Sequence, residues 1–211
     1  MYLSRVEIDT LNRRKIKDLY HLGAYHNWVE TSFPSEIENG ERLRHLWRID
    51  HLRGKDYLLV VSPEKPDLGM LSRYGVNGTA QTKDYGPFLE KLREGQKLRF
   101  RLVVNPVYRM FVSEKNTVGK LRTVAPGNQK EWLSEKAKKL GFSLENNSFD
   151  VTGRESLALY KKNNRRVNLS KATFEGVLTV TDLEAFKKTL TRGIGREKAY
   201  GMGMLTVIPF G

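Results

Sequence analysis

Apolar and polar residues alternate along several short segments of the first half, which is the pattern of half-buried β-strands. Two other segments space their apolar residues as helices do, and glycine or proline separates the elements. The predicted elements are a strand over 2–8, a helix from Asn12 or Arg13 to about Trp28, strands over 43–52 and 57–61, a short helix over 66–74 and a weak strand over 79–85. The turn over 53–56, Arg-Gly-Lys-Asp, joins the two middle strands as a hairpin.

The second half repeats this order with longer insertions. Its predicted elements are a strand over 97–104, a basic hairpin of 107–112 and 119–124 around a polar tip, a helix over 129–140, strands within 149–160 and 171–181 around a basic insertion, a helix over 183–190 and a last strand over 204–209. The order β-α-β-β-α-β is the ferredoxin-like plan that RNA-recognition domains share. We therefore expect an α+β protein of two tandem ferredoxin-like (RRM-like) domains, 1–92 and 96–211. This duplication is inferred from element order alone, because no sequence repeat accompanies it.

The composition favours chemistry without a metal or cofactor. The chain has 211 residues, 39% of them hydrophobic, and no cysteine, so disulfides, thiol nucleophiles and cysteine-based zinc sites are excluded. The four histidines, at positions 21, 26, 45 and 51, match no zinc motif. No run of about 18 apolar residues is present and the chain begins as a strand, so we expect a cytoplasmic protein with neither membrane span nor signal peptide.

Positive charge is concentrated in the second half. Residues 1–95 carry 15 Lys and Arg against 14 Asp and Glu, whereas residues 96–211 carry 22 against 10. The net charges are therefore +1 and +12, out of +13 for the chain. A polyanion footprint on one domain would produce this asymmetry, and nucleic acid is the partner it favours.

A loop near the end of the chain, residues 191–205, combines four glycines with three cations. Its bare backbone N–H groups and positive edge suit a phosphate. The loop is neither a Walker A loop nor a dinucleotide fingerprint, since it follows a helix and precedes a strand, so a polymer backbone is the better expectation. The alternative is a glycine-rich helix-to-strand turn with incidental charge. The residues expected to grip backbone phosphate are Arg192, Gly193, Gly195, Arg196, Lys198, Gly201 and Gly203.

Several separated motifs resemble one family, the CasE-type CRISPR repeat-processing endoribonucleases of type I-E systems. The matching pieces, in the family's order, are the opening Met-Tyr-Leu-Ser-Arg-Val, Asp18-Leu-Tyr followed by His26 seven residues before Phe33-Pro34, the strand 99–106, the string 173–179 and the terminal glycine loop. The resemblance implies two tandem ferredoxin-like domains and an RNA stem-loop ligand. It also implies metal-free cutting at the base of the repeat hairpin, a 2′,3′-cyclic phosphate product, and retention of that product in the surveillance complex called Cascade.

His26 is the candidate for proton transfer, because it matches the family's catalytic histidine by position. RNA carries its own nucleophile, the 2′-hydroxyl, so a metal-free enzyme must align that oxygen, move protons and stabilise charge. An imidazole can act at neutral pH as acid for the 5′-oxygen or as base for the 2′-hydroxyl. Some members place a tyrosine at the position of Gly23 here, and Tyr25 or Tyr20 could substitute for it; Tyr25 is the one we expect to act with His26.

Each histidine also has a structural interpretation. His26 shares the expected helix face with Leu19 and Leu22, where a histidine is more often simply packed. His21 lies one turn before Tyr25, which predicts a solvent-facing stacking pair. His45 and His51 are expected in strands, on one face, with structural roles.

The remaining basic residues are expected to bind RNA. The hairpin residues Arg109, Lys115, Lys120 and Arg122 should follow the stem, and the insertion residues Lys161, Lys162, Arg165 and Arg166 could also stabilise developing charge. Of the hairpin aromatics Tyr108 and Phe111, Phe111 is the one expected in the core. The competing interpretations are a non-catalytic RNA-binding subunit and a basic structural protein; a conventional RNA-recognition domain is disfavoured because its core motif is missing.

Overall fold

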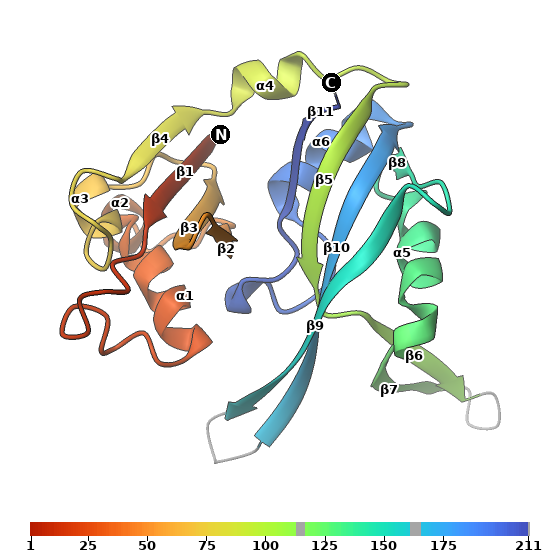
Figure 1. The fold of residues 1–211 in the computed structure, drawn as a ribbon, viewed down its shortest axis with the longest axis horizontal. Helices are drawn as coiled ribbons and strands as arrows, with labels where there is room; N and C mark the ends of the chain where they lie inside the picture. The colour runs from red at the N-terminus through yellow and green to blue at the C-terminus, as the bar shows by residue number, and fades with distance from the viewer. Residues whose placement is uncertain (113–116, 161–165, 211) are drawn as a thin grey trace. The chain divides into compact units, whose positions relative to one another are not determined.

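The computed structural model describes the backbone of residues 1–112, 117–160 and 166–210, and the side chains of 1–109, 119–157 and 168–210. The fold is α+β, as predicted, with antiparallel sheets and short helices (Figure 1). Two compact units form: unit 1 holds residues 1–92, 190–193 and 197–204, and unit 2 holds the rest. Much of the glycine-rich loop thus belongs to unit 1, although it follows unit 2 in sequence. The division into domains 1–92 and 96–211 stays a prediction.

Unit 1 contains one four-stranded antiparallel sheet in the order β2-β3-β1-β4. Its elements are β1 (Tyr2–Glu7), α1 (Leu22–Thr31), α2 (Pro34–Glu38), β2 (Leu46–Leu52), β3 (Lys55–Ser62), α3 (Leu68–Leu71), β4 (Gln81–Asp84), α4 (Gly86–Glu90) and, from the end of the chain, the 3₁₀ turn η3 (Lys198–Tyr200). The β2–β3 hairpin turns at Arg53 and Gly54, whose φ angles are 52° and 76°. A two-residue turn with both φ angles positive matches the twist of the strands, so the predicted hairpin is confirmed.

The helix expected from Asn12 or Arg13 to Trp28 begins later, at Leu22. His21 is extended and its Nδ1 accepts the Ala24 N–H at 3.0 Å, which caps the helix and sets its start. The preceding segment contains turns instead, such as the bond from the Leu19 N–H to the Ile16 carbonyl. Leu19 is buried although it lies in such a turn. The helical spacing of apolar residues in this segment therefore marks buried positions and not a helix.

Unit 1 has a core between its sheet and the helices α1 and α3. Val6 of β1 and Leu58 of β3 pack there with Trp28 of α1. The Trp28 indole N–H donates to the Leu71 carbonyl of α3 at 3.2 Å. This contact holds α1 against α3.

Unit 2 contains a sheet in the order β11-β5-β10-β8, with β9 also paired to β10, and a separate two-stranded hairpin. Its elements are β5 (Lys97–Val104), β6 (Val107–Val112), β7 (Thr117–Thr123), η2 (Pro126–Asn128), α5 (Gln129–Ala137), β8 (Phe142–Ser143), β9 (Phe149–Tyr160), β10 (Arg166–Val180), α6 (Leu183–Arg192) and β11 (Leu205–Pro209). The expected hairpin corresponds to β6 and β7, and α5 ends three residues before the predicted Leu140.

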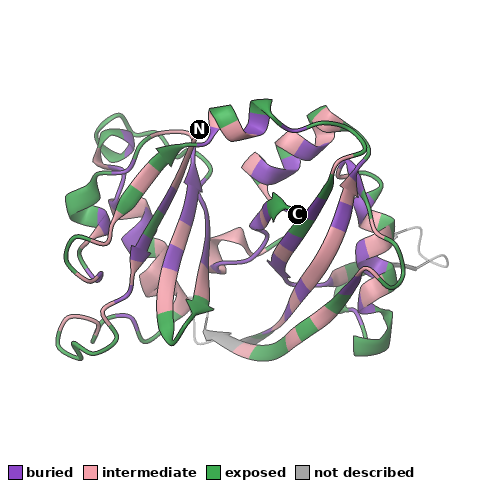
Figure 2. Ribbon diagram, turned by 45° about the horizontal axis from the view of Figure 1, so that its top comes forward, coloured by how far each residue is buried: buried purple, intermediate pink, exposed green. Residues whose placement is uncertain are grey.

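Aromatic pairs fill the core of unit 2. Trp132 of α5 stacks on Phe174 of β10 with ring centroids 6.4 Å apart, and Phe142 of β8 meets Phe186 of α6 edge-on at 6.0 Å. Along the strands, buried positions alternate with more exposed ones (Figure 2), as expected where successive side chains point to opposite faces of a sheet. No helix within the described residues is both long and apolar enough to cross a membrane.

Candidate active site

His26 lies on α1 beside an open cavity of about 680 Å³ in unit 1. The cavity is lined by Gly23, His26, Asn27, Glu30, Thr31, Glu36, Ile37, Gly40, Glu41 and Arg42. The His26 side chain is 39% exposed, but its Nδ1 is shut off from solvent and has no hydrogen-bond partner within the described part of the chain. The ring is thus partly packed, as a structural histidine would be, and partly open, as a proton carrier must be.

Burial is the main cause that lowers the pKa of His26 below its ordinary value. Glu30 opposes this shift, with its Oε1 3.8 Å from Nδ1, whereas His45, Arg42 and Arg44 add to it. The imidazole is therefore mostly neutral at neutral pH, and it can accept a proton there.

His45 lies between two carboxylates. Its Nδ1 is 2.9 Å from Glu30 Oε1, its Nε2 is 3.0 Å from Glu36 Oε1, and its side chain is 1% exposed. Burial disfavours the charged ring, but hydrogen bonds to the two carboxylates outweigh burial and raise the pKa of His45. His45 precedes β2 rather than lying in a strand, so the expected face shared with His51 is wrong; His51 is exposed and pairs with Asp56 at 2.9 Å.

Tyr25 is not among the residues that line the cavity. Its ring stacks on Trp47 of β2 with centroids 6.0 Å apart, and burial, then the charge of Asp56, raises the pKa of its hydroxyl. The predicted His21–Tyr25 stacking pair is wrong, because His21 meets Tyr20 edge-on at 4.5 Å. A catalytic role for Tyr25 stays a prediction.

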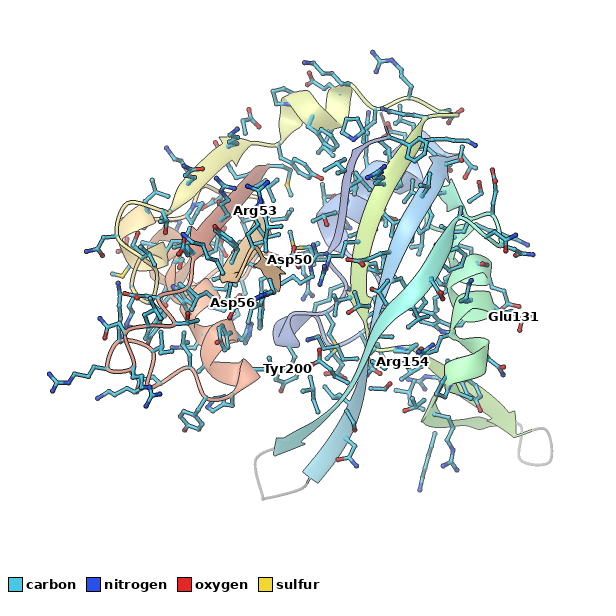
Figure 3. The ribbon with its side chains drawn as sticks, viewed as in Figure 1. Asp50, Arg53, Asp56, Glu131, Arg154 and Tyr200 are labelled. Carbon is cyan, nitrogen blue, oxygen red and sulfur yellow. The ribbon has the colours of Figure 1, made fainter. Side chains whose placement is uncertain are left out.

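The glycine-rich loop divides between the two units. In unit 1 its η3 turn contacts α1 and β2, so the end of the chain lies against the helix that carries His26. Lys198 of this turn is partly buried, and burial, then the nearby Arg44, lowers its pKa. Figure 3 labels Tyr200 of η3 together with Asp50, Arg53 and Asp56 of the β2–β3 hairpin.

The four glycines of this loop are required by backbone conformation or by packing, which the sequence predicts only in part. All four have positive φ, between 72° and 92°. Gly201 and Gly203 are buried, whereas Gly195 is exposed. A β-carbon at Gly193 would lie 2.7 Å from the Leu46 side chain, so close packing on β2 accounts for that glycine. Of the expected phosphate ligands, Arg192, Gly195 and Arg196 are exposed.

The other expected RNA-binding residues belong to unit 2. Arg109, Lys120 and Arg122 are exposed on the β6–β7 hairpin. The expectations for Lys115, Lys161, Lys162 and Arg165 fall outside the described residues, as do those for the side chains of Phe111 and Arg166.

Sequence analysis missed the charged residues around His26. Glu30 follows His26 by four positions on one helix, a spacing that brings side chains together and could have signalled the pair. Residues 41–45 alternate arginine with other residues, which favours a strand, but β2 begins only at Leu46. Among the described residues, no group of three or more His, Cys, Asp or Glu side chains could hold a metal ion.

Comparison with known proteins identifies the family. The model of the family described as CRISPR associated protein matches residues 1–209. The chain belongs to this family. CRISPR-associated endoribonuclease Cse3 from Thermus thermophilus is 30% identical over 220 residues, covering 99% of this chain and all of that protein.

Solved structures of CRISPR-associated proteins share the fold. A structure of the CRISPR endoribonuclease Cse3 bound to a 19-nucleotide RNA superposes with a TM-score of 0.80 at 29% identity, covering 99% of this chain and 100% of that one. A chain of a CRISPR RNA-guided surveillance complex in a pre-nicking state gives a TM-score of 0.65 at 25% identity, with both chains covered completely. The family resemblance seen in the sequence motifs is thereby confirmed over the whole chain.

Proposed function

We propose that this protein is an endoribonuclease that binds CRISPR repeat stem-loops in precursor CRISPR RNA and cleaves them into mature guide RNA. The reaction needs no metal ion or cofactor and leaves a 2′,3′-cyclic phosphate. The single observation that carries the proposal is His26, a half-exposed imidazole on the edge of an open cavity, in a chain whose relative is named an endoribonuclease.

Cleavage requires two proton transfers, one from the 2′-hydroxyl and one to the 5′-oxygen. The 2′-oxygen attacks phosphorus and loses its proton while the bond from phosphorus to the 5′-oxygen breaks, and that oxygen gains a proton. His26 carries out one of these transfers. Its lowered pKa suits it to accept the 2′-proton at neutral pH, whereas a bound phosphate would favour the protonated form that donates to the 5′-oxygen.

Exposed cations provide the RNA surface in this proposal. Arg109, Lys120 and Arg122 contact the stem, and Arg192 and Arg196, with the partly buried Lys198 and the exposed residue Gly195, contact backbone phosphate. Lys161, Lys162, Arg165 and Arg166 of the basic insertion are assigned the same role from the sequence. Tyr25 is the residue proposed to act with His26, and the raised pKa of its hydroxyl keeps that group protonated, so that it can donate a hydrogen bond.

Two tandem ferredoxin-like domains, 1–92 and 96–211, form the scaffold in this proposal. The support is the element order: α1 and α3 follow β1 and β3 in unit 1, and α5 and α6 follow β5 with its hairpin and β10 in unit 2. The surveillance complex of the relative makes the other subunits of a type I-E Cascade the expected protein partners.

The decisive experiment incubates the protein with the repeat RNA encoded beside its own gene, with a chelator throughout, and analyses the product ends. We expect cutting at the base of the hairpin and a cyclic-phosphate end. Loss of cutting on chelation would overturn the metal-free mechanism. Binding without any product would instead support a non-catalytic RNA-binding subunit.

A further inference from the structure

Four side chains of unit 1 form a charged network that begins at the partly exposed His26 and ends at the buried Glu36. Glu30 is shared, because its Oε1 lies 3.8 Å from His26 Nδ1 and 2.9 Å from His45 Nδ1. The other nitrogen of His45 lies 3.0 Å from Glu36 Oε1. The order of the network is therefore His26, Glu30, His45, Glu36.

The inner end of this network is rigid. The His45 ring stacks on Phe33 with centroids 3.9 Å apart and planes 8° from parallel. The Glu36 side chain is 4% exposed, and its second oxygen accepts the Leu43 N–H at 3.1 Å. A ring with a carboxylate at each nitrogen is satisfied when both nitrogens donate, which is the protonated form. His45 is therefore held in one orientation by contacts on both sides.

The outer end of the network is His26, the residue proposed to transfer a proton. His26 Nδ1 is buried and faces Glu30 at 3.8 Å, which is beyond hydrogen-bond reach but close enough for Coulomb attraction. Because the side chain is still 39% exposed, the open part of the ring leaves Nε2 as the nitrogen that can meet RNA.

We propose that Glu30, held in place by His45, is a positioning residue for this ribonuclease: it keeps Nδ1 of His26 turned inward, directs Nε2 to the RNA, and stabilises the imidazolium during proton transfer. This inference rests on the proposed function. Glu30 acts only through His26 and touches no reacting atom.

The charges around His26 explain why one carboxylate matters. Burial, His45, Arg42 and Arg44 all disfavour the protonated ring, and Glu30 is the group that favours it. Burial raises the pKa of Glu30, but the hydrogen bond from His45, then the charges of His45, His26 and Arg42, outweigh burial, so the pKa of Glu30 is lowered from its ordinary value. Glu30 therefore keeps its negative charge in the pH range where His26 must gain and lose its proton.

Two substitutions separate orientation from charge. Glu30→Gln retains an oxygen that accepts from His45 but removes the charge, whereas Glu30→Ala removes both. Glu38→Gln on α2 is the matched control, because it removes one negative charge from an exposed side chain outside the network. Thermal unfolding of each variant establishes that it is folded.

The test combines single-turnover cleavage of repeat RNA at saturating protein, the Kd for the RNA, and an NMR titration of the His26 ring in the free protein from about pH 5 to pH 9. For Glu30→Gln we expect an unchanged Kd, cleavage slower on the order of 10²-fold, and a His26 pKa lower than in the wild type. Glu30→Ala should lose at least as much rate. Glu38→Gln should match the wild type in all three measurements.

Several outcomes would overturn the inference. A Glu30→Gln variant with the wild-type rate and the wild-type His26 titration would make the network irrelevant to the reaction. If Glu30→Gln lowers the stability but leaves the single-turnover cleavage rate unchanged, the role of Glu30 is structural only. The same conclusion follows if the variant changes only the Kd for the RNA. A wild type that cuts no RNA would instead refute the proposed function, while the titration would still decide whether Glu30 controls the His26 proton.

Discussion

Gly201 lies directly against the indole of Trp47, so that a β-carbon at Gly201 would stand 2.7 Å from the ring. Trp47 is 1% exposed on β2 and stacks on Tyr25 of α1. The three residues therefore join the last turn of the chain to the second strand and to the helix that carries His26. A glycine selected for phosphate binding in the sequence is thus also required by packing.

Replacing Gly201 by alanine should destabilise the protein. The φ of 74° is unfavourable for alanine, and the added carbon must displace Trp47, a form of overpacking that costs about 1–3 kcal/mol. Urea unfolding would measure this loss. Gly54→Ala is the control, because its φ is 76° but nothing lies within 4 Å of the new carbon. Equal losses in the two variants would show that φ alone matters and that the Trp47 contact does not.

The sequence predicted the strands well because their determinants are local. The alternation of apolar and polar residues predicts β1 and β5, and a glycine at the turn predicts the β2–β3 hairpin. The sequence predicts too early a start for α1. Buried residues before it, such as Leu19, have the spacing of a helix, but they lie in turns. Periodicity records which residues are buried, and two backbone conformations can bury the same ones.

The core of the site was harder to predict, for a physical reason. His26 was found through its motif, but the Glu30–His45–Glu36 contacts join residues up to 15 positions apart in sequence. Only the packing of the segment before β2 onto α1 and α2 brings them together. The sequence therefore predicts a strand at His45, and its two carboxylate partners, distant in sequence, give no local signal.

His26→Ala should abolish most cutting while RNA binding persists. General acid–base catalysis contributes roughly 10²–10⁴-fold, so the single-turnover rate should fall by at least that factor. Gel-shift titration should give a Kd close to that of the wild type. His51→Ala is the control, since that side chain is 68% exposed and pairs only with Asp56 among the described residues. Cutting by His26→Ala at the wild-type rate would remove this residue from the mechanism.

Tyr25→Phe should slow cutting less than His26→Ala does. The phenyl ring keeps the contact with Trp47, so the variant should remain folded and only the hydroxyl is lost. Because burial raises the pKa of that hydroxyl, it stays protonated at neutral pH and serves only as a donor. The shape of the pH–rate profile should therefore not change. A wild-type rate in Tyr25→Phe would show that the hydroxyl takes no part.

The stability of the protein should fall as pH rises above the ordinary histidine pKa. Burial opposes protonation of His45, yet its two carboxylate partners raise the folded pKa above the unfolded value of 6.5. The native state therefore holds more protons than the unfolded chain, and the contribution of His45 is complete below pH 6.5 and lost as pH rises through the folded pKa. Urea unfolding at a series of pH values would measure it.

His45→Gln should flatten this pH dependence as well as lower the overall stability. His26→Ala is the comparison, because the lowered pKa of His26 acts in the window below 6.5 and the curve above it should keep its slope. A His45→Gln curve that remains parallel to the wild type above that pH would show that His45 is not protonated in the folded protein.

The β6–β7 hairpin should contribute to RNA affinity through charge. Lys120 and Arg122 are exposed on β7, so replacing both by glutamine should weaken binding of the repeat RNA and reduce the slope of log K against log salt by about one to two. Lys138→Gln with Lys139→Gln removes the same charge from an exposed segment after α5. Because loss of net charge alone would weaken both double variants equally, only a larger effect on the hairpin pair identifies the hairpin as a path for the RNA backbone. Equal effects would mean that the hairpin adds only to the general field of the protein.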